Sequence, residues 1–159
     1  MKIMFICTGN ICRSAMAHGM MEKLIKENNI DATVYSCGIY AETGDFATYN
    51  AVEAAKEYGV DISNHKATNI RESKIEEMDL ILCATMSHKQ SVIYLYPNLK
   101  TKVFTMKEYA KLEDNDQNMD IKDPWGYDEF VYRKCAEEIN DCLEKTIEML
   151  KIDNKTQRK

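Results

Sequence analysis

The chain has 159 residues, of which 45% are hydrophobic and 30% charged, and it carries only six glycines and two prolines. This length suits one domain of residues 1–159, and the composition excludes collagen-like, low-complexity and mainly disordered proteins. Because no apolar run approaches the roughly 18 to 20 residues of a membrane helix, and because the net charge is −5, we expect a cytosolic protein without a membrane or nucleic-acid partner.

Strands and helices are predicted to alternate from the start of the chain. The short apolar run Lys2–Cys7 indicates a strand that is buried on both faces. A helix is predicted next, with Ser14 as its N-cap and its end near Asn28. A second strand is predicted at 32–37 and a second helix at 48–58, which a glycine ends.

The alternation continues through the second half of the chain. Strands are predicted at 79–83 and 102–105, with a helix at 87–96 between them that the following proline ends. Residues 154–159 are expected to form a flexible tail. A long helix is predicted at 127–150, with one apolar stripe formed by Val131, Cys135, Ile139, Cys142, Leu143, Ile147 and Leu150.

This order of elements predicts an α/β fold, with a four-stranded parallel sheet and helices on both faces. Open parallel sheets bind ligands beyond the carboxyl ends of their strands, which is where the loop after Cys7 lies. The polar, acidic stretch 112–122 is a second candidate, because a loop this long in a small domain is usually functional or mobile.

The cysteines and histidines predict neither a metal nor another cofactor. A reducing cytosol and a domain-sized core argue that the cysteines are mostly thiols. No two cysteines form a C-x-x-C pair, and the three histidines are far apart in sequence, so a four-ligand zinc site would need unusual spacings. The six cysteines are Cys7, Cys12, Cys37, Cys83, Cys135 and Cys142.

The segment from Cys7 to Ser14 has the pattern Cys, five residues, Arg, Ser. The backbone amides of such a loop can surround a phosphate dianion, and the helix that follows adds its positive end. The same field stabilises a thiolate at Cys7, and Arg13 offers a planar fork for two phosphoryl oxygens. The pattern predicts Cys7 as a nucleophile beside a phosphate-binding loop of Thr8, Gly9, Asn10, Ile11, Cys12, Arg13 and Ser14.

This loop also permits two rival interpretations. Cys7 alone would more often be a buried thiol at the end of a strand, with Arg13 a surface cation. Because Gly9, Arg13 and Ser14 follow Cys7 at the spacings of the pattern, the interpretation of Cys7 as a nucleophile is favoured instead. A nucleotide-binding loop is excluded, because the pattern G-x-x-x-x-G-K is not met.

A thiolate that attacks phosphorus needs a group to protonate the departing oxygen, and Asp123 is the candidate. It begins the sequence Asp-Pro-Trp-Gly, in which the proline fixes the turn that follows. The alternative is a purely structural role, in which Asp123 only starts a turn before the last helix. Neighbouring acids leave the choice open, with Asp120 next in line: Glu113, Asp114, Asp116, Asp120 and Asp128.

These residues resemble the low-molecular-weight protein tyrosine phosphatases over essentially the whole chain. The matching segments are the loop from Cys7 to Ser14, the Ser-Cys-Gly turn at 36–38, the segment 61–65 and the Asp-Pro at 123–124. The resemblance implies that Cys7 attacks phosphorus, that Arg13 holds the phosphoryl group, and that Asp123 protonates the leaving oxygen and then deprotonates water. It also implies that no metal takes part.

The resemblance assigns supporting roles as well. Asn10 would hold the loop in a strained backbone conformation through partners such as Ser36 and His65, and Ser14 would donate a hydrogen bond to the Cys7 thiolate. Cys12 would trap Cys7 as a reversible disulfide after oxidation.

Two departures from the family pattern affect the surroundings of the loop. Relatives often carry Met-Asp at the end of the third strand, where this chain has Ala84-Thr85-Met86, so a supporting acid is missing there. The aromatic that often forms a pocket wall after the Ser-x-Gly turn is displaced. Tyr40 and Trp125, together with Ile11, are the expected walls of the substrate pocket, and Trp125 is the stronger candidate.

Protein phosphotyrosine is the expected substrate. Parts of the sequence also resemble bacterial protein arginine phosphatases, in which a threonine occupies the position of Ile11. Isoleucine cannot solvate a guanidinium but can pack on a phenol ring, which favours phosphotyrosine over phosphoarginine.

Two more functions compete with a phosphatase. One is a thiol-linked arsenate reductase on the same fold, whose relay past Cys83 has no close second cysteine in this chain. The other is a module that binds phosphate without catalysis, although such a module would not need the nucleophile. The oligomeric state is left open.

Overall fold

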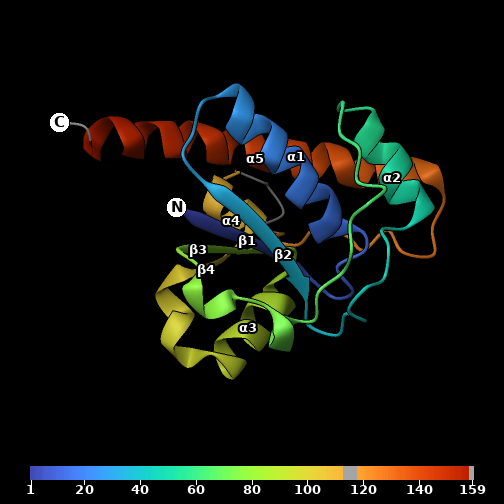
Figure 1. Ribbon diagram of the computed structural model, residues 1–159, viewed down its shortest axis with the longest axis horizontal. Helices are drawn as coiled ribbons and strands as arrows, with labels where there is room; N and C mark the ends of the chain where they lie inside the picture. The colour runs from blue at the N-terminus through green and yellow to red at the C-terminus, as the bar shows by residue number, and fades with distance from the viewer. Residues whose placement is uncertain (113–117, 158–159) are drawn as a thin grey trace.

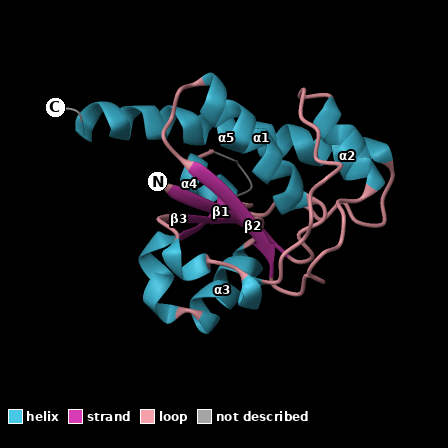
Figure 2. Cartoon of the chain, viewed as in Figure 1, coloured by secondary structure: helices cyan, strands magenta, loops and turns pink. Residues whose placement is uncertain are grey.

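Four parallel strands form one sheet in the computed structural model, which describes residues 1–112 and 118–157. The spatial order is β2-β1-β3-β4, so β1 is flanked by a strand on each side. Figures 1 and 2 show the strands side by side with helices above and below them. The strands are β1 (Lys2–Cys7), β2 (Thr33–Gly38), β3 (Leu80–Cys83) and β4 (Val103–Thr105). The predicted α/β fold with a four-stranded parallel sheet is confirmed.

Helices cover both faces of the sheet, as predicted (Figure 1). α1 and α5 lie along one face and α3 along the other, and α2 packs beside α1 and α5. Short 3-10 turns lie at 70–72, 75–77 and 97–102. The helices are α1 (Arg13–Glu27), α2 (Tyr49–Lys56), α3 (Met86–Leu95), α4 (Met106–Ala110) and α5 (Glu129–Gln157).

The apolar run of β1 explains why this strand lies in the middle of the sheet. Ile3 and Phe5 pack into the core beneath α1 and α5, while Met4 and Ile6 pack into a second core on the α3 side. All four side chains are at most 1% exposed. A strand with apolar residues on both sides needs a layer on each face, and that requirement produces the three-layer arrangement.

The start of α1 differs from the prediction. The helix begins at Arg13, with Cys12 at the N-cap position and no side chain capping it. Ser14 is therefore not the cap. Its hydroxyl forms hydrogen bonds with the side chains of Asn10 and Cys7 in the loop. It is therefore not available to accept from a backbone N–H of the first helical turn.

Two helices differ from the prediction, one because it was not predicted and one because it is longer than predicted. α4 is absent from the predicted elements, although Thr105 and Glu108 form a reciprocal capping box at its start. α5 begins at Glu129 and continues to Gln157, so residues 154–157 of the expected tail have helical backbone, and 158–159 lie outside the described residues. The mobility of the tail stays a prediction.

The carboxyl ends of the strands all lie at one edge of the sheet, and the loop after β1 opens there. Glycine at position 38 lets the end of β2 approach this loop. A Cβ at Gly38 would lie 2.5 Å from the carbonyl oxygen of Thr8 and 2.9 Å from the backbone nitrogen of Asn10. Only a residue without a side chain fits this contact. Within the described ranges, no helix combines the length and apolar character needed to span a bilayer.

Candidate active site

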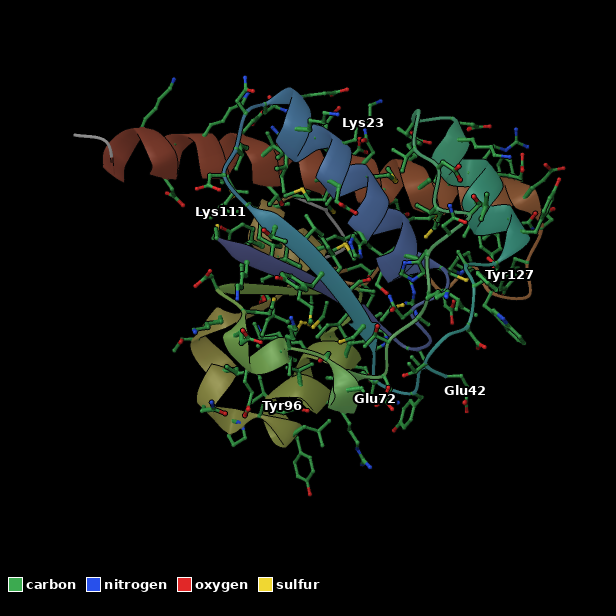
Figure 3. The ribbon with its side chains drawn as sticks, in the orientation of Figure 1. Lys23, Glu42, Glu72, Tyr96, Lys111 and Tyr127 are labelled. Atoms are coloured by element: carbon green, nitrogen blue, oxygen red, sulfur yellow. The ribbon has the colours of Figure 1, made fainter. Side chains whose placement is uncertain are left out.

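A pocket of about 250 Å³ opens at the carboxyl end of β1. It brings together the three residues predicted to be catalytic, one from the end of β1, one from the start of α1 and one from the segment before α5. Its lining residues are Cys7, Thr8, Gly9, Ile11, Cys12, Arg13, Asp123 and Trp125. Figure 3 shows the loops that surround this edge, with Tyr127 labelled just beyond the Asp-Pro-Trp-Gly turn.

The sulfur of Cys7 lies 2.9 Å from the hydroxyl oxygen of Ser14. The side-chain amide of Asn10 donates to the same oxygen at 2.7 Å, so that oxygen already accepts a hydrogen bond. The single proton of Ser14 is then free to point at the sulfur, which is the direction that stabilises a thiolate. Because Asn10 and Ser14 are 0% exposed, no water competes for these bonds.

Asn10 has a left-handed backbone conformation, with φ at 57°. Its side-chain oxygen accepts from the backbone nitrogen of Thr68 at 2.9 Å, and its carbonyl oxygen accepts from His65 Nε2 at 2.8 Å. A carbonyl oxygen can only accept, so Nε2 of His65 carries the proton. These contacts hold a conformation that costs about 1–2 kcal/mol for a residue with a side chain.

The contact expected between Ser36 and Asn10 is not found. The hydroxyl of Ser36 instead pairs with His18 Nδ1 at 2.7 Å. His18 Nε2 faces Glu22 at 3.1 Å, and burial lowers the pKa of His18 to about 4, so the neutral ring donates to Glu22 and accepts from Ser36. The His18 ring lies edge-on to His65, with centroids 6.0 Å apart. Ser36 thus reaches the loop only through two histidines, and its expected direct role is wrong.

Arg13 is 4% exposed and spans the gap between the loop and the Asp123 segment. Its Nη1 donates to the carbonyl oxygen of Ile121 at 2.9 Å, and its Nη2 lies 3.6 Å from a carboxylate oxygen of Asp123. Its Nε is buried and has no partner within the described part of the chain. A buried donor without a partner is costly, and a phosphoryl oxygen is an acceptor that would satisfy it.

Asp123 stands at the mouth of the pocket on a turn that it helps to form. One carboxylate oxygen accepts from the backbone nitrogen of Trp125 at 3.1 Å, as in an Asx turn, while the other faces Arg13. Asp123 therefore starts a turn and also lines the pocket, and its role as the acid stays a prediction. Among the rival acids, 113–117 lie outside the described residues, and Asp120 is used elsewhere.

Asp120 supplies a carboxylate to the segment that follows the third strand. Its carboxylate accepts from the backbone nitrogen of Met86 at 2.8 Å, at the start of α3. The next residue, Ile121, is fully buried and donates its backbone N–H to the carbonyl oxygen of Ala84 at 2.9 Å. A carboxylate at a helix N-terminus is electrostatically favourable, and here it also anchors the segment that carries Asp123.

The expected pocket walls are only partly found. Ile11 and Trp125 line the pocket, and the indole is 64% exposed, so its face is available to a ligand. Tyr40 does not line it. The backbone nitrogen of Tyr40 donates to the carbonyl oxygen of Thr8 at 2.9 Å, but its side chain is 79% exposed and lines a separate groove beside α3.

His88 is a residue of this region that the sequence did not reveal. It is 8% exposed, and its Nε2 lies 2.8 Å from the hydroxyl of Thr8, in the phosphate-binding loop. Its Nδ1 lies 2.8 Å from the hydroxyl of Thr85, the N-cap of α3. Burial and the neighbouring Arg13 lower the pKa of His88 to about 4, so a neutral ring links α3 to the loop. No local pattern points to this contact, because the two partners lie 80 residues apart in the sequence.

Cys12 lies in the loop but is held as a thiol. Its sulfur is 3.2 Å from the hydroxyl of Tyr132 and 3.6 Å from that of Thr48. Burial raises the pKa of Cys12, which favours the protonated form. All six cysteines are free, and Cys12 is therefore a resting thiol beside the pocket that Cys7 lines.

The groups around the pocket are sufficient for one kind of chemistry. They are a sulfur paired with a hydroxyl, a guanidinium beside a carboxyl group, and the residues of the loop that line the same pocket. That set of groups suits transfer of a phosphoryl group to and from sulfur. Among the described residues, no group of three His, Cys, Asp or Glu side chains could hold a metal ion.

Comparison with known proteins agrees with this geometry over nearly the whole chain. The family model described as low molecular weight phosphotyrosine protein phosphatase matches residues 2–157. A protein-arginine-phosphatase of Bacillus subtilis (strain 168) is 33% identical over 155 residues, which cover 98% of this chain and 100% of that protein. Among solved structures, a low molecular weight protein tyrosine phosphatase from T. tengcongensis is 41% identical with a TM-score of 0.86, covering 94% of this chain and 99% of that one. A YwlE arginine phosphatase, solved as a cysteine-to-serine mutant with a phosphorylated active-site serine, has a TM-score of 0.88 at 32% identity, covering 98% of this chain and 99% of that one. This chain therefore belongs to the low molecular weight phosphotyrosine protein phosphatase family.

Proposed function

We propose that this protein removes phosphate from phosphotyrosine in protein substrates, through a phosphate ester of Cys7. The observation that carries the proposal is the hydrogen bond between Ser14 and the Cys7 sulfur, at a pocket that Arg13 and Asp123 also line. In the related YwlE mutant, a serine that replaces a cysteine carries the phosphate, which supports a covalent intermediate.

The first half of the reaction transfers phosphorus to sulfur. The Cys7 thiolate attacks the phosphorus atom, so an S–P bond forms as the bond between phosphorus and the phenol oxygen breaks. Backbone amides of the loop and Arg13 hold the three non-bridging oxygens while charge builds up on them. Asp123, protonated at the start, gives its proton to the departing phenol oxygen.

The second half returns the enzyme to its starting state. Asp123, now a carboxylate, accepts a proton from a water molecule whose oxygen attacks phosphorus. The S–P bond breaks, inorganic phosphate leaves, and the electron pair of that bond restores the Cys7 thiolate. Ser14 stabilises this thiolate as a leaving group, and Asp123 ends the cycle protonated.

The choice of phosphotyrosine rests on the walls of the pocket. Ile11 and Trp125 offer apolar and aromatic surface to a phenol ring, and such contacts favour a flat aromatic leaving group. Protein arginine phosphatase activity is the second candidate, because a relative with that name matches 98% of the chain. The test is the ratio of kcat/KM for matched phosphotyrosine and phosphoarginine peptides. We expect Ile11→Thr to shift this ratio toward phosphoarginine, and an unchanged ratio contradicts our interpretation of the pocket.

Arsenate reduction is disfavoured by the placement of the remaining cysteines. Cys83 is 0% exposed in β3, and Cys135 on α5 points its thiol at the carbonyl oxygen of Lys122 at 3.8 Å. A disulfide relay needs thiols that can reach one another and then a reductant, and burial raises the pKa of both groups. Turnover of arsenate with thioredoxin, dependent on Cys7, would overturn this preference.

A binding module without catalysis is disfavoured by the contact between Ser14 and Cys7. A protein that only binds phosphate needs the amide loop and Arg13, but it has no use for a hydroxyl aimed at a sulfur. Hydrolysis of p-nitrophenyl phosphate by the wild type, lost in Cys7→Ser while inorganic phosphate still binds, separates the two. Hydrolysis that survives in Cys7→Ser contradicts the proposed function.

A further inference from the structure

We propose that a groove beside the catalytic pocket binds the polypeptide next to the phosphorylated residue of the substrate, and that it selects an acidic side chain there. We name it the α3 groove, with a volume of about 610 Å³. The proposal rests on the proposed function and adds the part of the substrate that the small pocket cannot reach. The residues that carry the argument are Ile39, Tyr40, Arg71, Ser87, Tyr94 and Leu95.

The α3 groove presents large side chains that have no role in the core. Tyr40 is 79% exposed, Tyr94 is 85% exposed and Leu95 is 41% exposed. Tyrosine supplies a rigid apolar ring with a polar tip, which makes it common where polypeptides are bound. Arg71 is also exposed and belongs to the same groove. Tyrosine and arginine are among the residue types that dominate the energetics of protein interfaces.

The groove is continuous with the phosphate-binding loop through the backbone. The backbone nitrogens of Ile39 and Tyr40 donate to the carbonyl oxygens of Cys7 and Thr8, at 3.0 and 2.9 Å. On the other side, Ser87 precedes His88, whose ring is hydrogen-bonded to the hydroxyl of Thr8. A polypeptide whose phosphorylated side chain enters the pocket can therefore continue directly into the groove.

Charge points to the kind of residue that the groove prefers. Arg71 is the only charged side chain among the described residues that line it, and no salt bridge engages this guanidinium within the described part of the chain. The adjacent Glu72 lines a different cavity, beside His18 and His65. Figure 3 labels Glu72 and Tyr96, the chain neighbours of Arg71 and Leu95, below the sheet on the α3 side. An exposed guanidinium in a groove that two tyrosine side chains also line suits a carboxylate of the bound polypeptide.

The test compares peptide substrates that differ only in flanking charge. One phosphotyrosine peptide carries Glu on both sides of the phosphorylated residue, and its partner carries Gln instead. We expect a higher kcat/KM for the Glu peptide, a preference of roughly threefold to tenfold that Arg71→Glu abolishes or reverses. Added salt should weaken the preference, since the contact is exposed. Tyr94→Ala should lower kcat/KM for both peptides.

Two controls separate the groove from the catalytic pocket. p-Nitrophenyl phosphate has no flanking residues, so its kcat and KM should not change in Arg71→Glu. Lys151→Glu reverses an exposed charge on α5, which covers the opposite face of the sheet, and it should leave the peptide preference intact. An equal loss of activity on all substrates, or a peptide preference that survives Arg71→Glu, overturns the proposal.

The outcome is distinguishable from a failure of the proposed function. If only phosphoarginine peptides are hydrolysed, phosphotyrosine is the wrong substrate, and the same Glu and Gln pair built around phosphoarginine tests the α3 groove. If Tyr94→Ala instead dissociates a dimer in sedimentation experiments while peptide kinetics are unchanged, a second copy of the chain occupies the groove and the proposal is wrong.

Discussion

The hydroxyl of Ser14 lies 2.9 Å from the sulfur of Cys7, and the amide of Asn10 determines which of the two atoms donates. With the Ser14 oxygen accepting from Asn10, its proton is directed at the sulfur. The loop therefore stabilises the negative charge before any substrate arrives, through two side chains that are fully buried.

Ser14→Ala tests this relationship. A hydrogen bond to a charged group contributes about 1.5–3 kcal/mol, so we expect kcat to fall by roughly 10- to 100-fold, with slower alkylation of Cys7 by iodoacetate at a fixed, mildly acidic pH. Ser36→Ala removes a hydroxyl that reaches the loop only through His18 and His65, and its effect on kcat should be much smaller. Equal losses in the two variants contradict the assignment.

Two variants of Asn10 separate the free-energy cost of its left-handed backbone conformation from the contribution of its side-chain hydrogen bonds. Asn10→Gly removes the amide but tolerates the positive φ, whereas Asn10→Ala removes the amide and also places a Cβ in the left-handed region. We expect Asn10→Ala to lower the free energy of unfolding by about 1 kcal/mol more than Asn10→Gly, as measured by urea denaturation. Identical values for the two variants would show that the conformation stores no strain.

Asp123 and Asp120 form a matched pair of carboxylates on one segment. Asp123→Asn should lower kcat by about 10²- to 10⁴-fold for aryl phosphates with a poor leaving group, because the departing oxygen then lacks its proton donor. Asp120→Asn should affect kcat little, since its carboxylate accepts from the backbone of Met86. Steady-state kinetics on phenyl phosphate decides between them, and the reverse order of effects assigns the acid to Asp120.

The buried histidines predict how stability depends on pH. Burial lowers the pKa of His18 and His88 to about 4, below the ordinary value near 6.5. Between these pH values the unfolded chain binds protons that the folded chain does not, so the free energy of unfolding falls as pH falls from about 6.5 to about 4.

The slope of that loss can be assigned to a single residue. Each histidine with a lowered pKa changes the free energy of unfolding by up to about 1.4 kcal/mol per pH unit in this window. His88→Gln, which keeps an amide near Thr8, should therefore show a shallower dependence of the free energy of unfolding on pH, measured by urea denaturation across the same window. A slope equal to that of the wild type would mean that folding does not lower the pKa of His88.

The fold and the reacting groups were predictable because both follow local patterns. A run such as Lys2–Cys7 indicates a strand buried on both faces, and the alternation of such runs with helical stripes specifies a parallel sheet. The loop after β1 is one continuous segment, so its spacing alone brings Cys7 and Arg13 to one pocket. Asp123 was predictable only as one acid among several.

The surroundings of the loop were not predictable, because they depend on residues that meet only after folding. His88 reaches Thr8 from α3, and Ile121 reaches Arg13 from the segment before α5. The prediction of Ser14 as a helix cap is wrong because the pattern of a cap is local, whereas the competing partners are set by the tertiary structure. Tyr40 is not a wall of the catalytic pocket. The direction of its side chain depends on the path of the chain after Gly38, which no local pattern specifies.

Trapping of the intermediate tests the central claim most directly. Turnover of an aryl phosphate is quenched rapidly, the protein is digested, and the peptides are examined by mass spectrometry under conditions that preserve thiophosphates. We predict that the mass of one phosphoryl group is added to the peptide that contains Cys7, and that prior treatment with iodoacetate abolishes it. Phosphate found on a different side chain, or hydrolysis that continues after Cys7 is alkylated, would contradict the account.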